Sequence, residues 1–223
     1  MVDGEMDLTE VGAELDGGSR VVLMVRHAER PKMDQDDPTF GMTLPLTDAG
    51  RRMSFDFGTR LRDYADGVQF LSSPLLRTRQ TAVCIAEGMG IADPDIPVDD
   101  ILGNSSPFFA DQHAVFELFR DGSFFERIFE YFATGRQTGF NEVHEAADRL
   151  EQWCVGRFTG RLGIYTTHDL YNAAFLFAKG VVPSFSRENW IRFLDSAAII
   201  LAPDGTRRFA FVRAGLSDGI VGV

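Results

Sequence analysis

The most informative segment of the sequence is Val21-Val22-Leu23-Met24-Val25-Arg26-His27-Ala28-Glu29-Arg30. Its first five residues are apolar, three of them β-branched, and the run is too short for a helix. It therefore predicts a strand that is buried on both faces, as strands of parallel sheets are. Polar residues follow where this strand ends. Because ligands bind at the carboxyl ends of strands in open α/β sheets, residues 26–30 also mark the place where a functional site is expected.

The sequence on either side of this strand alternates between strand and helix patterns. Further strands are expected at 68–71 and 162–166, and helices that start at the Thr47 cap, at Ser73-Pro74, at 141 and at 169. Two strands at 191–202 and 209–213 flank a Pro203-Asp204-Gly205 turn and indicate a closing hairpin. This order predicts an α/β fold, a three-layer sandwich with a mainly parallel central sheet and one antiparallel edge.

The domain organisation is predicted to be simple. Residues 1–19 are acidic and contain several glycines, so we expect a flexible segment there. Residues 20–223 are expected to form one domain, interrupted by a helical insertion around 104–140 that holds 9 of the 20 phenylalanines. That insertion could be ordinary apolar core, or a lid that presents an aromatic surface to a substrate.

Composition excludes several classes of function. The formal net charge is -11, which argues against nucleic acids and anionic membranes as partners. No apolar run approaches the roughly 18–20 residues of a membrane span, and the N-terminus lacks the pattern of a signal peptide. The two cysteines, Cys84 and Cys154, are interpreted as buried free thiols. These features favour a cytoplasmic protein.

Arginine and histidine follow three of the predicted strands, at what would be one edge of the sheet. Arg26, His27 and Arg30 follow the first strand, Arg77 lies just after the second, and His168-Asp169 follow the third. Guanidinium groups match phosphate oxygens in pairs, and a neutral imidazole can attack phosphorus. The sequence therefore predicts an anion site. It offers no convincing metal cluster, since His113 and His144 are isolated in helical regions.

Several motifs resemble those of the histidine phosphatase superfamily, which includes phosphoglycerate mutases and histidine acid phosphatases. Val25-Arg26-His27-Ala28-Glu29 resembles its Arg-His-Gly motif, with Ala28 in place of glycine, and Leu46-Thr47-Asp48-Ala49-Gly50 resembles its Leu-Thr-x-x-Gly helix start. The segment from Ser72 to Ala82 is similar to Ser-x-x-x-Arg-x-x-Gln-Thr-Ala, and Thr167-His168-Asp169 resembles the late histidine motif.

The resemblance implies a role for each matching residue. His27 would be the nucleophile that becomes phosphohistidine, and Arg26, Arg77 and His168 would bind the phosphoryl group. Arg30 occupies the place of a second phosphate-binding arginine in the acid phosphatase branch. Asp169 would be the general acid, with Asp99 or Asp100 as the alternative. No metal or other cofactor is implied.

The expected function is a metal-independent phosphatase that hydrolyses a small phosphomonoester. The alternatives are a phosphoglycerate-type mutase and a non-catalytic module that binds a phosphorylated ligand or a protein. The mutase branch usually places a Glu in a Leu-x-Glu setting, whereas this chain reads Asp99-Asp100-Ile101-Leu102-Gly103-Asn104 there. Sugar phosphates, nucleotides, phosphoproteins and lipid-linked phosphates remain open as substrates, and so does the oligomeric state.

Overall fold

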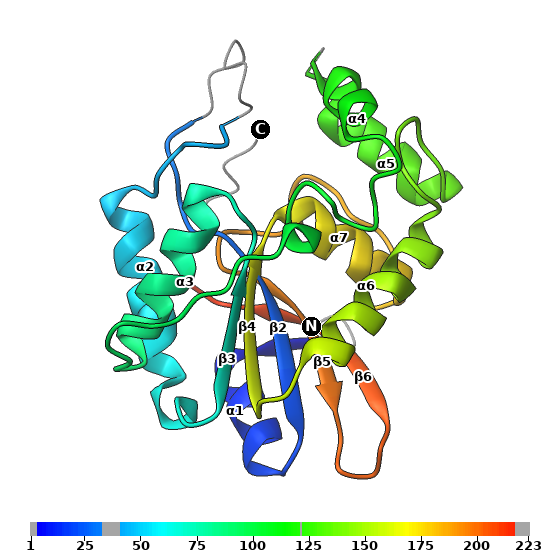
Figure 1. Cartoon of the computed structure of the whole chain (residues 1–223). Coiled ribbons are helices and arrows are strands. Elements are labelled where there is room, and N and C mark those ends of the chain that lie inside the picture. Colours follow the sequence, from blue (N-terminus) through cyan, green and yellow to red (C-terminus); the bar gives the residue numbers. More distant parts are fainter. Residues whose placement is uncertain (1–3, 33–40, 121, 217–223) are drawn as a thin grey trace.

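Six strands form one sheet in the order β1-β6-β5-β2-β4-β3 (Figure 1). The computed structural model describes residues 4–32, 41–120 and 122–216. The strands are β1 (Glu5–Asp7), β2 (Arg20–Arg26), β3 (Val68–Ser72), β4 (Leu162–Thr167), β5 (Ser196–Leu201) and β6 (Arg207–Arg213). β2, β3 and β4 pair in parallel, and β5 pairs antiparallel with both β2 and β6. The predicted α/β class and the antiparallel pairing of the closing hairpin are confirmed, and β1 takes the edge beyond β6.

Helices cover both faces of this sheet. One face carries α1 (Leu8–Asp16), α2 (Asp48–Arg60) and α3 (Leu76–Gly88), and the other carries α4 (Gln112–Phe119), α5 (Phe124–Thr134), α6 (Val143–Arg157) and α7 (Asp169–Ala178). Short 3-10 turns lie at Arg62–Tyr64 and Asp100–Leu102. Each face of the sheet has its own hydrophobic core. Along β2, Val21, Leu23 and Val25 belong to the core beneath α1, α2 and α3, and Val22 and Met24 belong to the core beneath α4 to α7. This alternation explains why the strand reads as an unbroken apolar run.

The strand register places the predicted polar residues at one edge. Val25 and Ser72 both pair with Thr166, from opposite sides of β4. The backbone continues this pairing past the strands, because the His27 amide donates to the Thr167 carbonyl at 3.0 Å and the Ser73 amide donates to the Thr166 carbonyl at 3.0 Å. The polar ends of the three strands therefore lie side by side.

The prediction of a flexible N-terminal segment is wrong for residues 5–16, while residues 1–3 lie outside the described part of the chain. β1 pairs in parallel with β6, and Asp7 caps α1 through a capping box with Glu10. Leu8, Val11 and Leu15 are buried in the core. Their spacing of three and four residues is helical, but the acidic and glycine-rich composition hides it.

Two helix starts test the capping predictions. Thr47 does cap α2, because its hydroxyl accepts the Gly50 amide at 2.9 Å. The expected start of α3 at Ser73-Pro74 is wrong, since that helix begins at Leu76 and no side chain caps it. Ser73 instead turns its hydroxyl toward Thr78 and His168.

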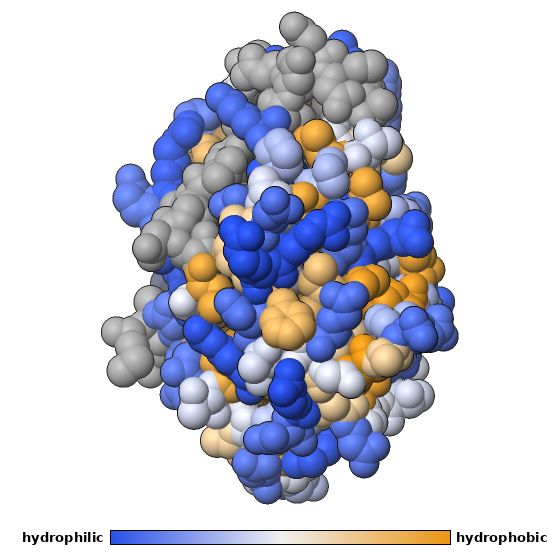
Figure 2. All heavy atoms as spheres, turned by 90° about the vertical axis from the view of Figure 1, so that its left-hand side faces the viewer, coloured by the Kyte–Doolittle hydropathy of each residue, from blue (hydrophilic) through white to orange (hydrophobic). Residues whose placement is uncertain are grey.

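The outer face of α2 and α3 is mostly polar, with isolated apolar side chains (Figure 2). Phe55 and Leu76 are 43% and 37% exposed there. In the described part of the chain, every helix is too short or too polar to span a bilayer.

Candidate active site

Arg26 ends β2 and is held in a buried polar setting. Its Nη1 donates to the Ile191 carbonyl at 2.5 Å, and its Nη2 lies 3.1 Å from Oδ2 of Asp169. The guanidinium stacks over the Phe193 ring, 4.5 Å from its centroid. The side chain is only 2% exposed, so these contacts fix the direction in which the remaining N–H groups point.

His27 is held in one tautomer. Its Nδ1 lies 2.9 Å from the Ala28 carbonyl, and a carbonyl oxygen can only accept, so the proton of a neutral ring belongs on Nδ1. The lone pair is then on Nε2. Burial, together with the charges of Arg77 and Arg26, holds the pKa of His27 well below its usual value. The ring is therefore neutral near pH 7, as a nucleophile must be.

Two arginines reach the same place from different elements. Arg77 lies in the first turn of α3, is 8% exposed and donates from Nη1 to the Gly41 carbonyl at 2.7 Å. Burial, and then the nearby charge of Arg30, lower the pKa of Arg77 to about 10. Burial also lowers the pKa of Arg30, which is half-buried in the segment after β2. The positive charges of Arg26, Arg30 and Arg77 are therefore close enough to repel one another.

A chain of hydroxyl groups sets the protonation of His168. The hydroxyl of Thr78 lies 2.7 Å from the Leu75 carbonyl and 2.8 Å from the hydroxyl of Ser73. Since the carbonyl can only accept, Thr78 donates to it and accepts from Ser73. Ser73 must then accept from Nε2 of His168, 3.2 Å away, so neutral His168 carries its proton on Nε2. Burial and the charge of Arg77 hold the pKa of His168 well below its usual value.

Asp169 opens α7 directly after His168. Its Oδ1 accepts the Leu170 amide at 2.9 Å, and its Oδ2 accepts Nε1 of Trp190 at 3.1 Å besides facing Arg26. Burial alone would raise the pKa of Asp169, but the charge of Arg26 and the Trp190 hydrogen bond outweigh it and lower the pKa. The carboxylate is ionised in the unliganded protein at neutral pH.

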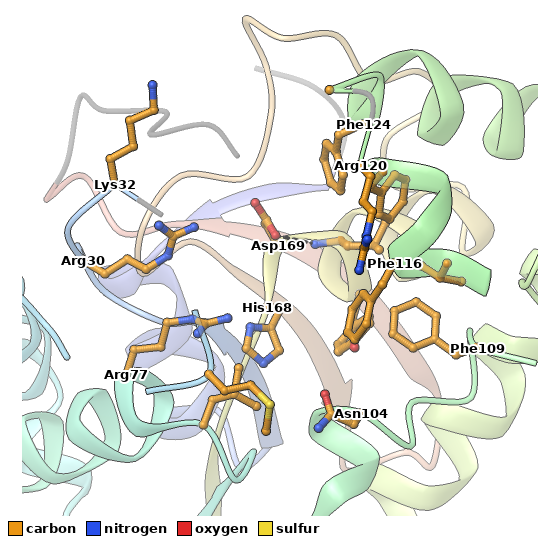
Figure 3. A pocket seen from close by; sticks show the side chains of 17 residues that line it. Arg30, Lys32, Arg77, Asn104, Phe109, Phe116, Arg120, Phe124, His168 and Asp169 are labelled. Atoms are coloured by element: carbon orange, nitrogen blue, oxygen red, sulfur yellow. Dashed lines mark hydrogen bonds between the residues drawn. The ribbon is translucent and has the colours of Figure 1, made fainter. Parts of the chain in front are cut away.

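These side chains line one end of a cavity of about 280 Å³ (Figure 3). Arg30, Arg77, His168 and Asp169 form its polar end. Asp169 is the only carboxylate among the described residues that line it. The buried ring of His27 is next to this end, with its centroid 5.6 Å from that of His168. An anion in the cavity would meet several cations and one carboxylate.

The opposite wall of the cavity is aromatic. It is built mainly by α4, α5 and the first turn of α7 (Figure 3). The aromatic side chains are Phe109, Phe116, Phe119, Phe124 and Tyr171. Lys32 and Arg120 add two further cations to the lining.

Hydrogen bonds and close packing from residues outside the cavity hold the segment that carries His27 in place. The Ala28 amide donates to the hydroxyl of Thr81 at 3.0 Å, and the hydroxyl of Thr47 lies 2.7 Å from Oε1 of Glu29. A Cβ on Gly50 would lie 2.2 Å from the Glu29 carbonyl oxygen, so only glycine fits against this segment. The Leu-Thr-x-x-Gly and Gln-Thr-Ala motifs thus support the strand end that bears His27.

The structure brings together six of the predicted site residues and leaves the others apart. Arg30, Arg77, His168 and Asp169 line the polar end of the cavity. Arg26 and His27 are buried next to them, in contact through the Arg26–Asp169 ion pair and the His27–His168 ring pair. Neither Asp99 nor Asp100 is among the residues that line the cavity. The first is paired with Arg157 at 3.0 Å, and the second accepts the Asn104 amide.

The remaining candidate residues lie elsewhere. His113 is exposed on α4, and His144 contacts the Ala178 carbonyl. Cys84 and Cys154 are buried free thiols whose pKa is raised by burial. Sequence reasoning missed Trp190 and Phe193, because they follow α7 without a motif, and it missed the Ser73–Thr78 contact.

Residues 22–102 match the family model described as histidine phosphatase superfamily (branch 1). No curated protein matches the chain. The solved structure of Bacillus stearothermophilus YhfR is similar to it, with 18% identity and a TM-score of 0.59 over 88% of this chain and 99% of that one. The mycobacterial glucosyl-3-phosphoglycerate phosphatase with inorganic phosphate has 16% identity and a TM-score of 0.54 over 89% and 100% of the two chains.

Phosphoglycerate mutase from Bacillus anthracis is also similar, with 14% identity and a TM-score of 0.53 over 89% of this chain and 95% of that one. At these identities the solved structures show the shared fold alone. The family-model match confirms the resemblance of residues 22–102 to the superfamily.

Proposed function

From this match to the histidine phosphatase superfamily, we propose that the chain is a metal-independent phosphatase that hydrolyses a phosphomonoester through phosphohistidine on His27. One observation carries the proposal. The Nδ1 proton of His27 is engaged by the Ala28 carbonyl, so the lone pair of the neutral ring is on Nε2, and the ring lies next to His168 and under the charges of Arg77 and Arg26. A neutral imidazole nitrogen next to guanidinium groups suits attack on a bound phosphoryl group.

The first half-reaction forms the phosphohistidine. Arg26, Arg30 and Arg77 bind the phosphoryl oxygens and stabilise the charge that spreads over them in the transition state. The bound dianion also raises the pKa of His168, so that this ring takes up a second proton and donates to a phosphoryl oxygen from Nδ1 while Nε2 keeps its contact with Ser73. Nε2 of His27 attacks phosphorus, the bond from phosphorus to the leaving oxygen breaks, and Asp169 gives its proton to that oxygen. A dianionic phosphate in the cavity would raise the pKa of Asp169 and compete for Arg26, so the carboxyl can be protonated in the complex.

The second half-reaction regenerates the enzyme. Water attacks phosphorus on the face opposite His27, Asp169 takes up a proton from this water, and the bond from phosphorus to nitrogen breaks. Inorganic phosphate leaves, and His27 again carries only its Nδ1 proton. The arginines supply the positive charge throughout, so this route needs no metal ion.

The acid in this scheme is Asp169 rather than Asp99 or Asp100. Asp169 lies at the polar end of the cavity, whereas Asp99 is paired with Arg157. The alternative mutase activity would use the same histidine but would need a phosphorylated primer. The small cavity and the acidic remainder of the chain favour a small phosphorylated substrate over nucleic acids or membranes. Two buried free thiols fit the cytoplasm.

Phosphate release from phenyl phosphate, with and without EDTA, tests the proposal. We expect release by the wild type in both conditions, and its loss in His27→Ala, because no other nucleophile replaces Nε2. His113→Ala is the matched control, since His113 is exposed and outside the cavity. Quenched reactions should contain an acid-labile phosphoryl group on the wild type alone.

Three outcomes would contradict the proposal. Dependence on a bisphosphate primer, with no release of inorganic phosphate, would indicate a mutase. Loss of activity with EDTA would refute metal independence. No release from any member of a broad phosphoester panel would indicate a binding module.

A further inference from the structure

The cavity has two chemically different ends. Arg30, Arg77 and His168 extend into it from one side, and Phe109 and Phe116 face them from the other (Figure 3). A phosphoryl group bound at the cationic end therefore projects its leaving group toward the aromatic wall. The chemistry of that wall sets which leaving groups fit.

The Phe-rich segment divides between core and cavity. Phe108 is fully buried in the core, as expected for a structural residue. Phe109, Phe116 and Phe119 are only partly buried and line the cavity. One part of the segment therefore belongs to the core and another part lines the cavity, where the lid interpretation would place it.

The rings of the wall pack on one another, edge to face between Phe109 and Tyr171 and tilted between Phe119 and Phe124. The Phe109 centroid lies 5.4 Å from that of Tyr171, with an interplanar angle of 72°, and the Phe119 centroid lies 4.9 Å from that of Phe124. The hydroxyl of Tyr171 is already engaged with the Gly103 carbonyl at 2.8 Å. These side chains offer aromatic faces and edges, and the polar groups of the lining on their side of the cavity are Arg120 and Asn104.

We propose that this wall selects phosphomonoesters whose leaving group carries an aromatic ring. This inference rests on the proposed function and names its substrate class. An aromatic leaving group would bury apolar surface and make edge-to-face contacts with the wall. A polyol would lose water and find few hydrogen-bond partners for its hydroxyls on the aromatic side chains themselves. The cavity of about 280 Å³ has room for one or two rings.

Three substrates with alcohol leaving groups of similar acidity measure this preference. They are benzyl phosphate, cyclohexylmethyl phosphate and glycerol 3-phosphate. We expect kcat/KM to be roughly tenfold to a hundredfold higher for benzyl phosphate than for glycerol 3-phosphate. It should also be several-fold higher than for cyclohexylmethyl phosphate, because a saturated ring lacks the edge-to-face contacts. Equal values for all three, or a preference for the saturated ring, would overturn the inference.

A matched pair of variants locates the preference. Phe116→Ala removes a ring from the wall and should lower kcat/KM for benzyl phosphate by roughly tenfold, mainly through KM. It should leave glycerol 3-phosphate nearly unchanged. Phe129→Ala removes an equal ring from α5, where Phe129 packs on Phe125 and Trp190 and does not line the cavity. If both variants lose the preference equally, the effect comes from helix packing and the inference is wrong.

Binding of phosphonates separates this inference from the proposed function, because phosphonates are not hydrolysed. Calorimetry should show that benzylphosphonate binds the wild type at least about tenfold more tightly than methylphosphonate, and that Phe116→Ala removes the difference. If no ester is hydrolysed but this difference is present, the proposed function fails and the aromatic selectivity stands. If esters are hydrolysed without preference and the phosphonates bind alike, the selectivity fails and the function stands.

Discussion

Replacing Asp169 with asparagine should separate proton donation from phosphate binding. The carboxylate accepts the Leu170 amide at 2.9 Å and Nε1 of Trp190 at 3.1 Å, and lies 3.1 Å from Arg26. Asparagine keeps an oxygen for one of these contacts and can take the same rotamer, but it cannot give a proton to a leaving group. The change therefore removes the proton donor and the negative charge with little change of shape.

The expected loss depends on the leaving group. Protonation of the leaving group contributes about 10²–10⁴-fold, equivalent to about 3–5 kcal/mol of transition-state stabilisation. We expect that loss in kcat/KM for benzyl phosphate, whose alkoxide is a poor leaving group. For 4-nitrophenyl phosphate, whose phenolate leaves without a proton, the loss should be less than about tenfold. Asp99→Asn, outside the cavity, is the control and should change neither value.

Although Asp169→Asn should lower kcat/KM, it should strengthen inhibition by inorganic phosphate. Asp169 is the only carboxylate among the described lining residues, and it forms an ion pair with Arg26, the guanidinium for which a bound phosphate would compete. Removing its charge ends its repulsion of the anion and releases that guanidinium, so Asp169→Asn should bind phosphate about tenfold more tightly. Equal losses of kcat/KM with both esters, or weaker phosphate binding, would remove Asp169 from the proposed role.

Three further predictions concern groups around the site and the core. Because the folded protein holds the pKa of His27 and His168 well below 6.5, the unfolded chain binds more protons below about pH 6.5. The free energy of unfolding should then fall with decreasing pH by up to about 1.4 kcal/mol per unit for each histidine, and His168→Gln should reduce this slope in urea titrations. Thr78→Val frees the Ser73 hydroxyl to donate to His168, so ¹⁵N NMR should show the ring proton moving from Nε2 to Nδ1; an unchanged tautomer would contradict the hydrogen-bond directions given above. Leu15→Ala should lower the free energy of unfolding by about 2–5 kcal/mol, whereas a change below about 0.5 kcal/mol would indicate that α1 is not part of the core.

The site could be predicted because its residues follow strands of one parallel sheet. Once Val25 and Ser72 flank Thr166, the residues after each strand must meet, so motif positions alone indicate the cluster. Trp190 and Phe193 could not be found in this way. They lie between α7 and β5, and only the path of that segment through space brings them to Asp169 and Arg26.

The fold could be predicted where local patterns and packing agree. The five apolar residues of β2 contribute side chains to both cores, so their unbroken apolar run correctly predicts a buried strand. α1 was missed because its composition resembles a solvated tail, although Leu8, Val11 and Leu15 are spaced for a helix. The start of α3 was misplaced because the Ser73 hydroxyl that would cap a helix is used by Thr78 and His168.

The unliganded site should reduce the stability of the protein, and Arg77 offers a test. Its pKa is lowered to about 10 by burial and by Arg30, so the charged form is disfavoured in the folded state by at most about 3 kcal/mol at neutral pH. Arg77→Met keeps much of the apolar stem and loses the hydrogen bond to the Gly41 carbonyl, which costs about 1 kcal/mol. The free energy of unfolding of the variant should therefore exceed that of the wild type by up to about 2 kcal/mol. Phosphate at a hundred times its Kd should stabilise the wild type by about 2.7 kcal/mol and the variant far less. A variant that is less stable than the wild type, yet equally stabilised by phosphate, would show that the guanidinium neither destabilises the unliganded protein nor binds the anion.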